Sequence, residues 1–246
     1  MPYSREYFRL NFLFAERAAE LARISRPEAL FLYTHLYRSF RLGNSFDPNH
    51  PIWLEYLAGL AGVADPPGWT HAFCKLRHAS LPPRIPENAF GCFSCDLWED
   101  GRVRLHFRNA EPPGVSPLCQ ARYPVRRAEL ADLFAHIRRT LPENARVMGG
   151  SWMYNIEAYR RLFPLQFLQT ARPVWTDFQY IALWGQFLDR DGGVRSLPAA
   201  EFEQRVQQAV RLEDLPGCFP LPVLYLEESI QVFYRHFEIP PSGGDP

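Results

Sequence analysis

Apolar residues in the first part of the chain recur with the spacing of helices. Residues 5–23 predict one helix, and Ser-Arg-Pro-Glu at 25–28 has the cap, the proline and the acidic residue that begin a second one. The apolar positions of the second helix are Leu30, Tyr33, Leu36, Tyr37 and Phe40. A third helix is predicted from Pro51 onward. We therefore expect a helical N-terminal unit over residues 1–62.

Prolines interrupt this pattern over residues 63–89. The prolines of this segment are Pro66, Pro67, Pro82, Pro83 and Pro86. Because proline removes a backbone donor and restricts the residue before it, we interpret the segment as a linker with a short helix near 69–77. The end of the chain, 240–246, is predicted to be disordered.

From residue 90 the hydrophobic period changes to two, which indicates β-strands. The alternating runs 90–98 and 103–107 flank an Asp-Gly turn and predict a β-hairpin. The other predicted elements are helices at 125–140, 155–162 and 198–211, strands at 145–148 and 178–188, and a last helix through Leu226, Ile230, Phe233 and Phe237. The expected fold class is α+β: the helical unit is followed by a domain at 90–239 with a mixed, mainly antiparallel sheet flanked by helices.

The hairpin holds the first candidate site. A two-residue Asp-Gly turn would place Arg104, His106 and Arg108 on one face. Guanidinium groups beside an imidazole suit a phosphate or carboxylate ligand, and His106 is a candidate general base. Asp96 falls on the opposite, apolar face, where we expect it to be buried beside an arginine. The alternative is an ordinary solvated face, and a shift of register by one residue would change every pair.

A second candidate site is the segment 149–155, Gly-Gly-Ser-Trp-Met-Tyr-Asn, between a predicted strand and a predicted helix. Glycines permit close approach to the backbone, and free N–H groups at a helix start attract anions. The candidate ligand-binding residues are Gly149, Gly150 and Trp152, and the candidate catalytic residues are Ser151, Tyr154 and Asn155. The alternative is a tight turn in which Asn155 caps the helix.

Composition limits the classes of function. Lys+Arg and Asp+Glu both number 27, so the formal net charge is zero and no basic excess points to nucleic acid. No uncharged run is long enough to span a membrane. The cysteines and histidines lack the spacing of metal ligands, so we expect no metal site. The odd count of scattered cysteines and the polar N-terminus favour a cytoplasmic protein.

The order of elements from residue 90 resembles the second half of a GNAT-type acyltransferase fold. The segments that carry the likeness are Val-Arg-Leu-His-Phe at 103–107, the helix at 125–140, the strand at 146–148 and Gly-Ser-Trp-Met-Tyr-Asn at 150–155. The last of these fills the place of a Ser-Trp pair that follows a strand in a family with a helical N-terminal partner. Phe178-Gln179 would begin the next strand, so the resemblance spans about residues 90–190. The usual acyl-CoA loop, a basic or Gln residue followed by Gly-x-Gly/Ala, is not evident.

This resemblance implies an acyltransferase-like protein that uses an acyl-CoA or a similar anionic ligand. The arginines of the hairpin would hold the anion, His106 would act as the base, and residues 151–155 would orient the acceptor or the thioester. The expected partner is a small molecule, with no nucleic acid and no membrane. The alternative is a non-catalytic binding or scaffold protein that uses the helical N-terminal surface, which exposed Tyr33, Tyr37 or Trp53 would favour. A small hydrolase is a third possibility, although spacing alone assembles no triad.

Overall fold

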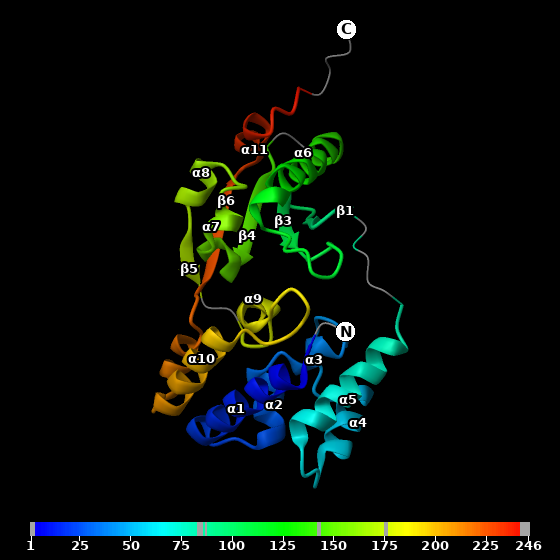
Figure 1. The fold of residues 1–246 in the computed structure, drawn as a ribbon, viewed down its shortest axis with the longest axis vertical. Helices are drawn as coiled ribbons and strands as arrows, with labels where there is room; N and C mark the ends of the chain where they lie inside the picture. Colours follow the sequence, from blue (N-terminus) through cyan, green and yellow to red (C-terminus); the bar gives the residue numbers. More distant parts are fainter. Residues whose placement is uncertain (1–2, 83–85, 87, 142–143, 175–176, 242–246) are drawn as a thin grey trace. The chain divides into compact units, whose positions relative to one another are not determined.

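The chain forms two compact units, each built from two segments. The structure is a computed structural model and describes residues 3–82, 86, 88–141, 144–174 and 177–241. Unit 1 comprises Met1–Pro83 and Trp175–Leu221, and unit 2 comprises Arg84–Val174 and Pro222–Pro246 (Figure 1). This division differs from the expected one, because residues 175–221 belong with the N-terminal helices rather than with a domain at 90–239. Most of the expected tail, 242–246, lies outside the described residues.

Unit 1 is built from helices. Its elements are α1 (Arg5–Ala22), α2 (Arg26–Tyr33), α3 (Leu36–Ser39), α4 (Pro51–Leu60), α5 (Pro66–Ala79), α9 (Ile181–Trp184), α10 (Ser196–Gln208) and the 3-10 helices η3 (Gly185–Phe187) and η4 (Leu212–Cys218). The predicted helix at 5–23 is confirmed as α1, and Ser4 caps it by accepting a hydrogen bond from the Tyr7 amide. Helix α1 contacts α2, α5 and α10 and is the centre of the unit.

Helices α2 and α3 replace the single helix predicted after residue 25. Ser25 caps α2 as expected, because its hydroxyl accepts a hydrogen bond from the Glu28 amide at 3.3 Å. The helix ends at Tyr33, since Thr34 has an extended backbone with φ −129° and ψ 164°. The Thr34 hydroxyl donates back to the Leu30 carbonyl, a local bond that competes with continuation of the helix.

Helix α5 occupies much of the expected linker at 63–89. Pro66 and Pro67 lie in its first turn, where a missing N–H costs no helical hydrogen bond. Asp65 caps the helix by accepting a hydrogen bond from the Gly68 amide at 3.2 Å. The segment is therefore a packed helix longer than the one predicted at 69–77, and its prolines mark a helix start rather than a break.

The predicted strand at 178–188 is wrong, because this segment forms α9 and η3 in unit 1. Its most buried apolar residues, Leu183, Trp184 and Phe187, are spaced as on one face of a helix. Trp184 packs edge-on against Phe14 of α1, with ring centroids 5.7 Å apart. A short continuous apolar run does not distinguish a buried strand from a buried helix, which explains the error.

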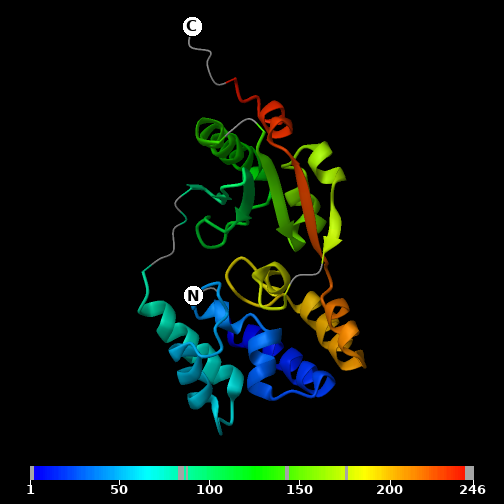
Figure 2. The ribbon, with the colours of Figure 1, turned by 180° about the vertical axis from the view of Figure 1, so that it is seen from behind.

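Unit 2 is an α+β unit around a six-stranded sheet (Figures 1 and 2). Its strands are β1 (Ala89–Phe90), β2 (Phe93–Leu97), β3 (Arg102–Phe107), β4 (Arg146–Ser151), β5 (Arg172–Val174) and β6 (Val223–Ser229). Its helices are α6 (Tyr123–Thr140), α7 (Glu157–Arg160), α8 (Leu165–Gln169), α11 (Ile230–His236) and the 3-10 helices η1 (Gln120–Arg122) and η2 (Trp152–Asn155). The spatial order is β1-β2-β3-β4-β6-β5, in which β3 and β4 are parallel and the other neighbours antiparallel. The α+β class and the mixed sheet agree with expectation.

Strands β4 and β6 differ from the predicted elements. Strand β4 continues through Gly149 and Gly150, so these glycines lie inside the sheet rather than in a loop. Strand β6 was missed: Leu226, predicted on the last helix, lies in it, and α11 begins only at Ile230 after a cap at Ser229. Strand β6 pairs with both β4 and β5, so residues near the end of the chain, rather than 178–188, supply this strand of the sheet.

The hairpin register is shifted by one residue from the prediction. The turn has three residues rather than two: the Trp98 amide donates to the Arg102 carbonyl at 2.9 Å, and the Gly101 amide donates to the Trp98 carbonyl at 3.0 Å. Gly101 has a φ of +81°, the left-handed conformation that such three-residue turns require. The shift places Asp96 opposite Arg104 and His106 opposite Ser94. Asp96 therefore lies on the polar face, and its predicted burial on the apolar face is wrong.

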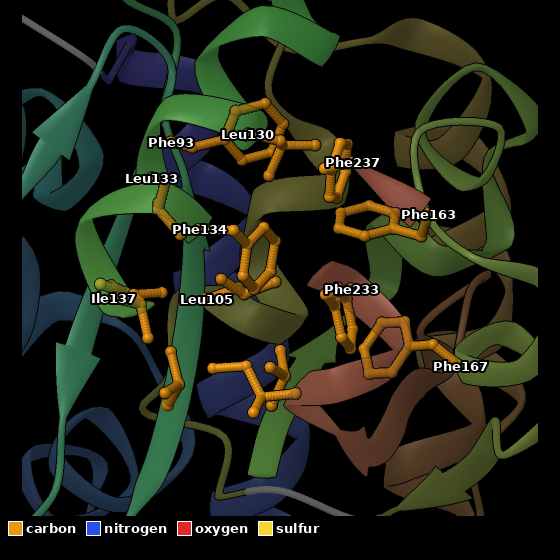
Figure 3. Close-up of a cluster of buried hydrophobic side chains, with 14 of the residues drawn as sticks. Phe93, Leu105, Leu130, Leu133, Phe134, Ile137, Phe163, Phe167, Phe233 and Phe237 are labelled. Carbon is orange, nitrogen blue, oxygen red and sulfur yellow. The ribbon is translucent and has the colours of Figure 1, made fainter. Parts of the chain in front are cut away.

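The apolar face of the sheet forms the core of unit 2 with helices α6 and α11. Figure 3 shows aromatic and aliphatic side chains from both helices and from β2 and β3 gathered in this core. Phe134 of α6 stacks on Phe233 and on Phe237, with ring centroids 4.8 and 5.3 Å apart. Phe93 and Leu105 reach the same cluster from the hairpin. This core fixes which face of each strand points away from the helices.

A buried ion network lies at the edge of this core. The Arg126 side chain of α6 is 2% exposed and pairs with Glu111 at 2.8 Å and with Glu129 at 2.6 Å. Glu129 also accepts a hydrogen bond from the Cys92 amide at 3.0 Å. The network therefore connects α6 to the loop after β3 through Glu111, and to the residue before β2 through the Cys92 amide. Charges this well buried are tolerated because each has an opposite partner.

Candidate functional site

The face of the unit 2 sheet opposite the core carries most of its polar side chains. Side chains alternate between faces along a strand, and residues paired across strands share a face. The residues of this charged face, assigned from the strand pairings, are Ser94, Asp96, Arg102, Arg104, His106, Arg146, Met148, Gly150, Arg172, Tyr225, Glu227 and Ser229. The structure thus brings Arg104, His106 and Gly150 to one face of one sheet.

His106 forms a hydrogen-bonded pair with Asp96. Its Nε2 lies 2.7 Å from Asp96 Oδ2, and the side chains are 41% and 62% exposed. Because an ionised carboxylate only accepts hydrogen bonds, this contact assigns the Nε2 proton to the bond and leaves Nδ1 as the basic nitrogen. A pair so exposed adds only about 0–1 kcal/mol to stability. Its clearest effect is to orient the imidazole.

The other carboxylates of this region are also paired. Asp100 of the turn lies 2.6 Å from Arg102, whose guanidinium is 4.4 Å from the ring centroid of Trp98. Glu227 lies 2.5 Å from Arg146 and accepts a hydrogen bond from the Tyr225 hydroxyl. The bonds from Tyr225 and Arg146 hold the pKa of Glu227 below its usual range. Partial burial, and then the charge of Glu227, raises the pKa of Tyr225.

Arg104 is a cation of this face that these pairings leave out. It is half-buried and stands directly across from Asp96, whose nearer contact is His106. Within the described part of the chain no ion pair joins Arg104 to a carboxylate. Arg108, predicted to act with Arg104, lies beyond the end of β3 and is exposed, and its amide donates to the Cys92 carbonyl at 2.9 Å.

The predicted catalytic residues of the second segment are not part of the charged face. Tyr154 is 2% exposed and packs in the core against Tyr159 and Phe163, with ring centroids 5.1 and 5.5 Å apart. Burial raises the pKa of Tyr154 well above its usual range. Ser151 accepts a hydrogen bond from the Met153 amide at 3.1 Å and caps η2. These side chains have structural partners that explain them.

Trp152 and Asn155 likewise complete the local structure of η2. Asn155 Nδ2 donates to the carbonyls of Trp152 and Pro222, at 2.7 and 2.9 Å. The alternative in which Asn155 caps the following helix is wrong, because α7 follows Ile156 without a side-chain cap and Asn155 bonds carbonyls rather than helix amides. Trp152 is half-buried at the start of this turn.

The two glycines of β4 face opposite sides of the sheet. A Cβ at Gly149 would lie 2.2 Å from the Tyr154 hydroxyl, so glycine there makes room for the tyrosine in the core. A Cβ at Gly150 would have no atom within 4 Å, so this position is an open spot on the charged face. Gly150 pairs with Tyr225 of β6 and follows Met148, which stands beside Arg104. Of the two glycines, only Gly150 lies where it could contact a ligand bound to the charged face.

Sequence reasoning missed the contribution of β5 and β6 to this face. Arg172, Tyr225 and Glu227 belong to strands that were not predicted, although the alternation of Val223, Tyr225 and Glu227 with leucines has the period of a strand. Asp96 was considered but assigned to the wrong face. The signal that would have corrected it is the hydrogen-bonding complementarity of Asp96 and His106 on adjacent strands, which favours one shared face.

The aromatic residues proposed for a partner surface on the N-terminal helices are mostly internal. Tyr37 and Trp53 are 0% and 1% exposed, and their rings pack on each other with centroids 5.9 Å apart. Tyr33 stacks on Phe178 at 5.4 Å. Exposure of these aromatic side chains would have favoured the scaffold alternative, and Tyr37 and Trp53 are buried instead.

The described residues contain no group of three or more His, Cys, Asp or Glu side chains that is arranged to hold a metal ion. Among the helices that the structure describes, none combines the length and the apolar character needed to cross a membrane. The chain matches no family model, no curated protein and no solved structure.

Proposed function

We propose that the charged face of unit 2 binds an anionic small molecule, an acyl-CoA or a ligand with similar phosphate or carboxylate groups. The observation that carries the proposal is Arg104, a half-buried guanidinium without a carboxylate partner among the described residues. A guanidinium in this position offers a planar donor pair to a phosphate or carboxylate. Asp96 and Glu227 are engaged by other groups and therefore compete less for Arg104.

His106 is the proposed base for acyl transfer at this face. Asp96 holds Nε2, so Nδ1 is the atom that accepts a proton from an acceptor amine or hydroxyl as it attacks the thioester carbonyl. The C–S bond then breaks, and the proton passes from the imidazole to the leaving thiolate. The resemblance of residues 90–190 to GNAT-type acyltransferases supports this choice of ligand, except over 178–188, which is helical. The roles proposed for Ser151, Tyr154 and Asn155 lack support, because their side chains serve η2 and the core.

Thermal unfolding of the full chain with acetyl-CoA and longer acyl-CoAs tests the binding proposal. A ligand at about 100 times its dissociation constant stabilises the folded protein by about 2.7 kcal/mol, which raises the melting temperature measurably. We expect this rise in the wild type, its loss in Arg104→Met, and its retention in Arg139→Met. Arg139 is exposed on α6 and provides a matched loss of one charge away from the charged face. Absence of protection by every acyl-CoA, or equal protection in Arg104→Met, would contradict the proposal.

A separate assay tests the role of His106. Release of free thiol from acetyl-CoA in the presence of a mixture of amines reports transfer, and His106→Asn should lose this activity while keeping the thermal protection. Asp96→Ala should reduce turnover less than His106→Asn, since it removes only the group that orients the base. Turnover that is unchanged in His106→Asn would rule out this residue as the base.

A further inference from the structure

A second arginine borders the charged face from the other side. Arg172 of the edge strand β5 pairs with Tyr225 of β6, and its guanidinium lies 5.1 Å from the centroid of the Tyr225 ring. Among the described residues it has no ion pair with a carboxylate. Arg104 and Arg172 are thus two cations of this face that are available to an anion, and they stand on opposite sides of β4 and β6.

The strand order fixes the approximate spacing of these two cations. From β3 to β5 the sheet has three strand spacings of about 4.8 Å, or about 14 Å across the strands. Arg104 is in register with Glu227 and Arg172 with Tyr225, so the two arginines are also offset by two residues, about 7 Å, along the strands, and their backbones are about 16 Å apart. Because the Arg172 guanidinium lies over Tyr225, on the next strand inward, the gap between the charged groups is nearer to about 12 Å. Two anionic groups about 12–16 Å apart would therefore reach both arginines at once.

The strip between the two arginines is open at one point. Gly150 has no side chain, and a Cβ there would meet no atom within 4 Å. Met148, its neighbour on the same face, is only 6% exposed, and the Tyr225 hydroxyl lies 3.9 Å from its sulfur. Glu227 stands opposite Met148 on β6, and Arg146 and the Tyr225 hydroxyl already bind it. A ligand that crosses the sheet here meets Gly150 and the Tyr225 side chain between two cations.

We propose that the ligand of the charged face is an elongated dianion that binds Arg104 with one anionic group and Arg172 with the other, while its uncharged middle lies over Gly150 and the Tyr225 side chain. This inference rests on the proposed function and specifies its ligand. One exposed ion pair is worth only about 0–1 kcal/mol, too little for measurable binding of a monoanion. A second anionic group on the same molecule binds at a high effective concentration once the first is held, so two contacts together give a usable affinity.

Calorimetric titration of the full chain with linear dicarboxylates tests this inference. The probes are succinate, adipate, suberate and sebacate, with octanoate as the monoanion. We expect affinity to rise along the series as the carboxylates approach a separation of about 12–16 Å, and octanoate to bind at least fivefold more weakly than the best dianion. Arg172→Met and Arg104→Met should each weaken the best dicarboxylate by about fivefold, a loss of about 1 kcal/mol, whereas Arg139→Met should leave it unchanged.

The outcomes separate this inference from the proposed function. If acyl-CoA binding depends on Arg104 but Arg172→Met changes nothing and the dicarboxylates bind no better than octanoate, the dianion inference fails and the proposed function stands. If no anion of either kind binds the wild type, both fail. Gly150→Val is a second test, because a Cβ at this position meets no atom within 4 Å and the larger side chain would obstruct the strip. Unchanged affinity for the best dicarboxylate in a folded Gly150→Val protein would also overturn the inference.

Discussion

Mild acid is expected to destabilise unit 1 through one buried imidazole. His35 is 3% exposed between α2 and α3, and its Nδ1 lies 3.0 Å from the Tyr7 hydroxyl of α1. Its amide donates to Asn11 Oδ1 at 3.1 Å. Burial, with a smaller contribution from the charge of Arg38, lowers the pKa of His35 from 6.5 to about 3. The folded protein therefore keeps this imidazole neutral well below neutral pH.

The direction of the pH effect follows from these two pKa values. Above pH 6.5 the imidazole is neutral in the folded and in the unfolded chain, so stability has its full value. Below that pH the unfolded chain binds a proton that the folded chain does not bind until about pH 3. The free energy of unfolding then falls by up to about 1.36 kcal/mol per pH unit. Between pH 6.5 and pH 5 the loss from His35 is about 2 kcal/mol.

Urea unfolding of the wild type and of His35→Gln, at about pH 7.5 and about pH 5, measures this loss. Tryptophan fluorescence reports on unit 1 through the buried Trp53 and Trp184, and on unit 2 through Trp98 and Trp152. Glutamine keeps a hydrogen-bonding group near Tyr7 but does not titrate. Other titrating groups affect both proteins alike, so we expect the wild type to lose about 2 kcal/mol more than the variant on acidification. Equal losses in the two proteins would refute the reasoning.

Two predictions concern unit 2. Arg126→Met should cost about 3–5 kcal/mol in urea unfolding, because it leaves the largely buried Glu129 without its cation while Glu111 keeps Arg122, whereas Arg139→Met at an exposed site should stay within about 0.5 kcal/mol; a small effect of Arg126→Met would show that the network adds little. Gly149→Ala should cost about 1–3 kcal/mol, because its Cβ would clash with the Tyr154 ring, while Gly150→Ala should be nearly neutral. Tyr154→Phe should recover part of the Gly149→Ala loss, and a loss of similar size at both glycines would contradict the assigned faces.

Local signals were enough to predict much of unit 1. Helix α1 has a clear period and a serine cap, and the Ser-Arg-Pro-Glu start of α2 acts as predicted. The run at 178–188 failed because its helical form depends on packing against α1 of the N-terminal segment. Contacts between segments so far apart in the chain leave no local pattern in the sequence. The return of residues 175–221 to unit 1 was unpredictable for the same reason.

The candidate site was predicted in part. Arg104 and His106 share a face because they are two residues apart on a strand, which any register preserves. Their neighbours depend on the turn, and Glu-Asp-Gly is compatible with a two-residue or a three-residue loop that differ by one position in register. This difference of one residue in register decides whether the Asp96 side chain lies on the same face as His106 or points into the core. Arg172 became a neighbour only through the pairing of β5 and β6, which joins segments far apart in sequence.

An NMR titration of the full, isotopically labelled chain with acetyl-CoA tests the central claim most directly, because backbone amide shifts locate a ligand without a choice of mutation. The account predicts that the largest shifts fall on β3, β4 and β6, at and beside Arg104, His106 and Gly150, with little change in α1 or α5. Shifts confined to unit 1, or none at saturating ligand, would contradict it.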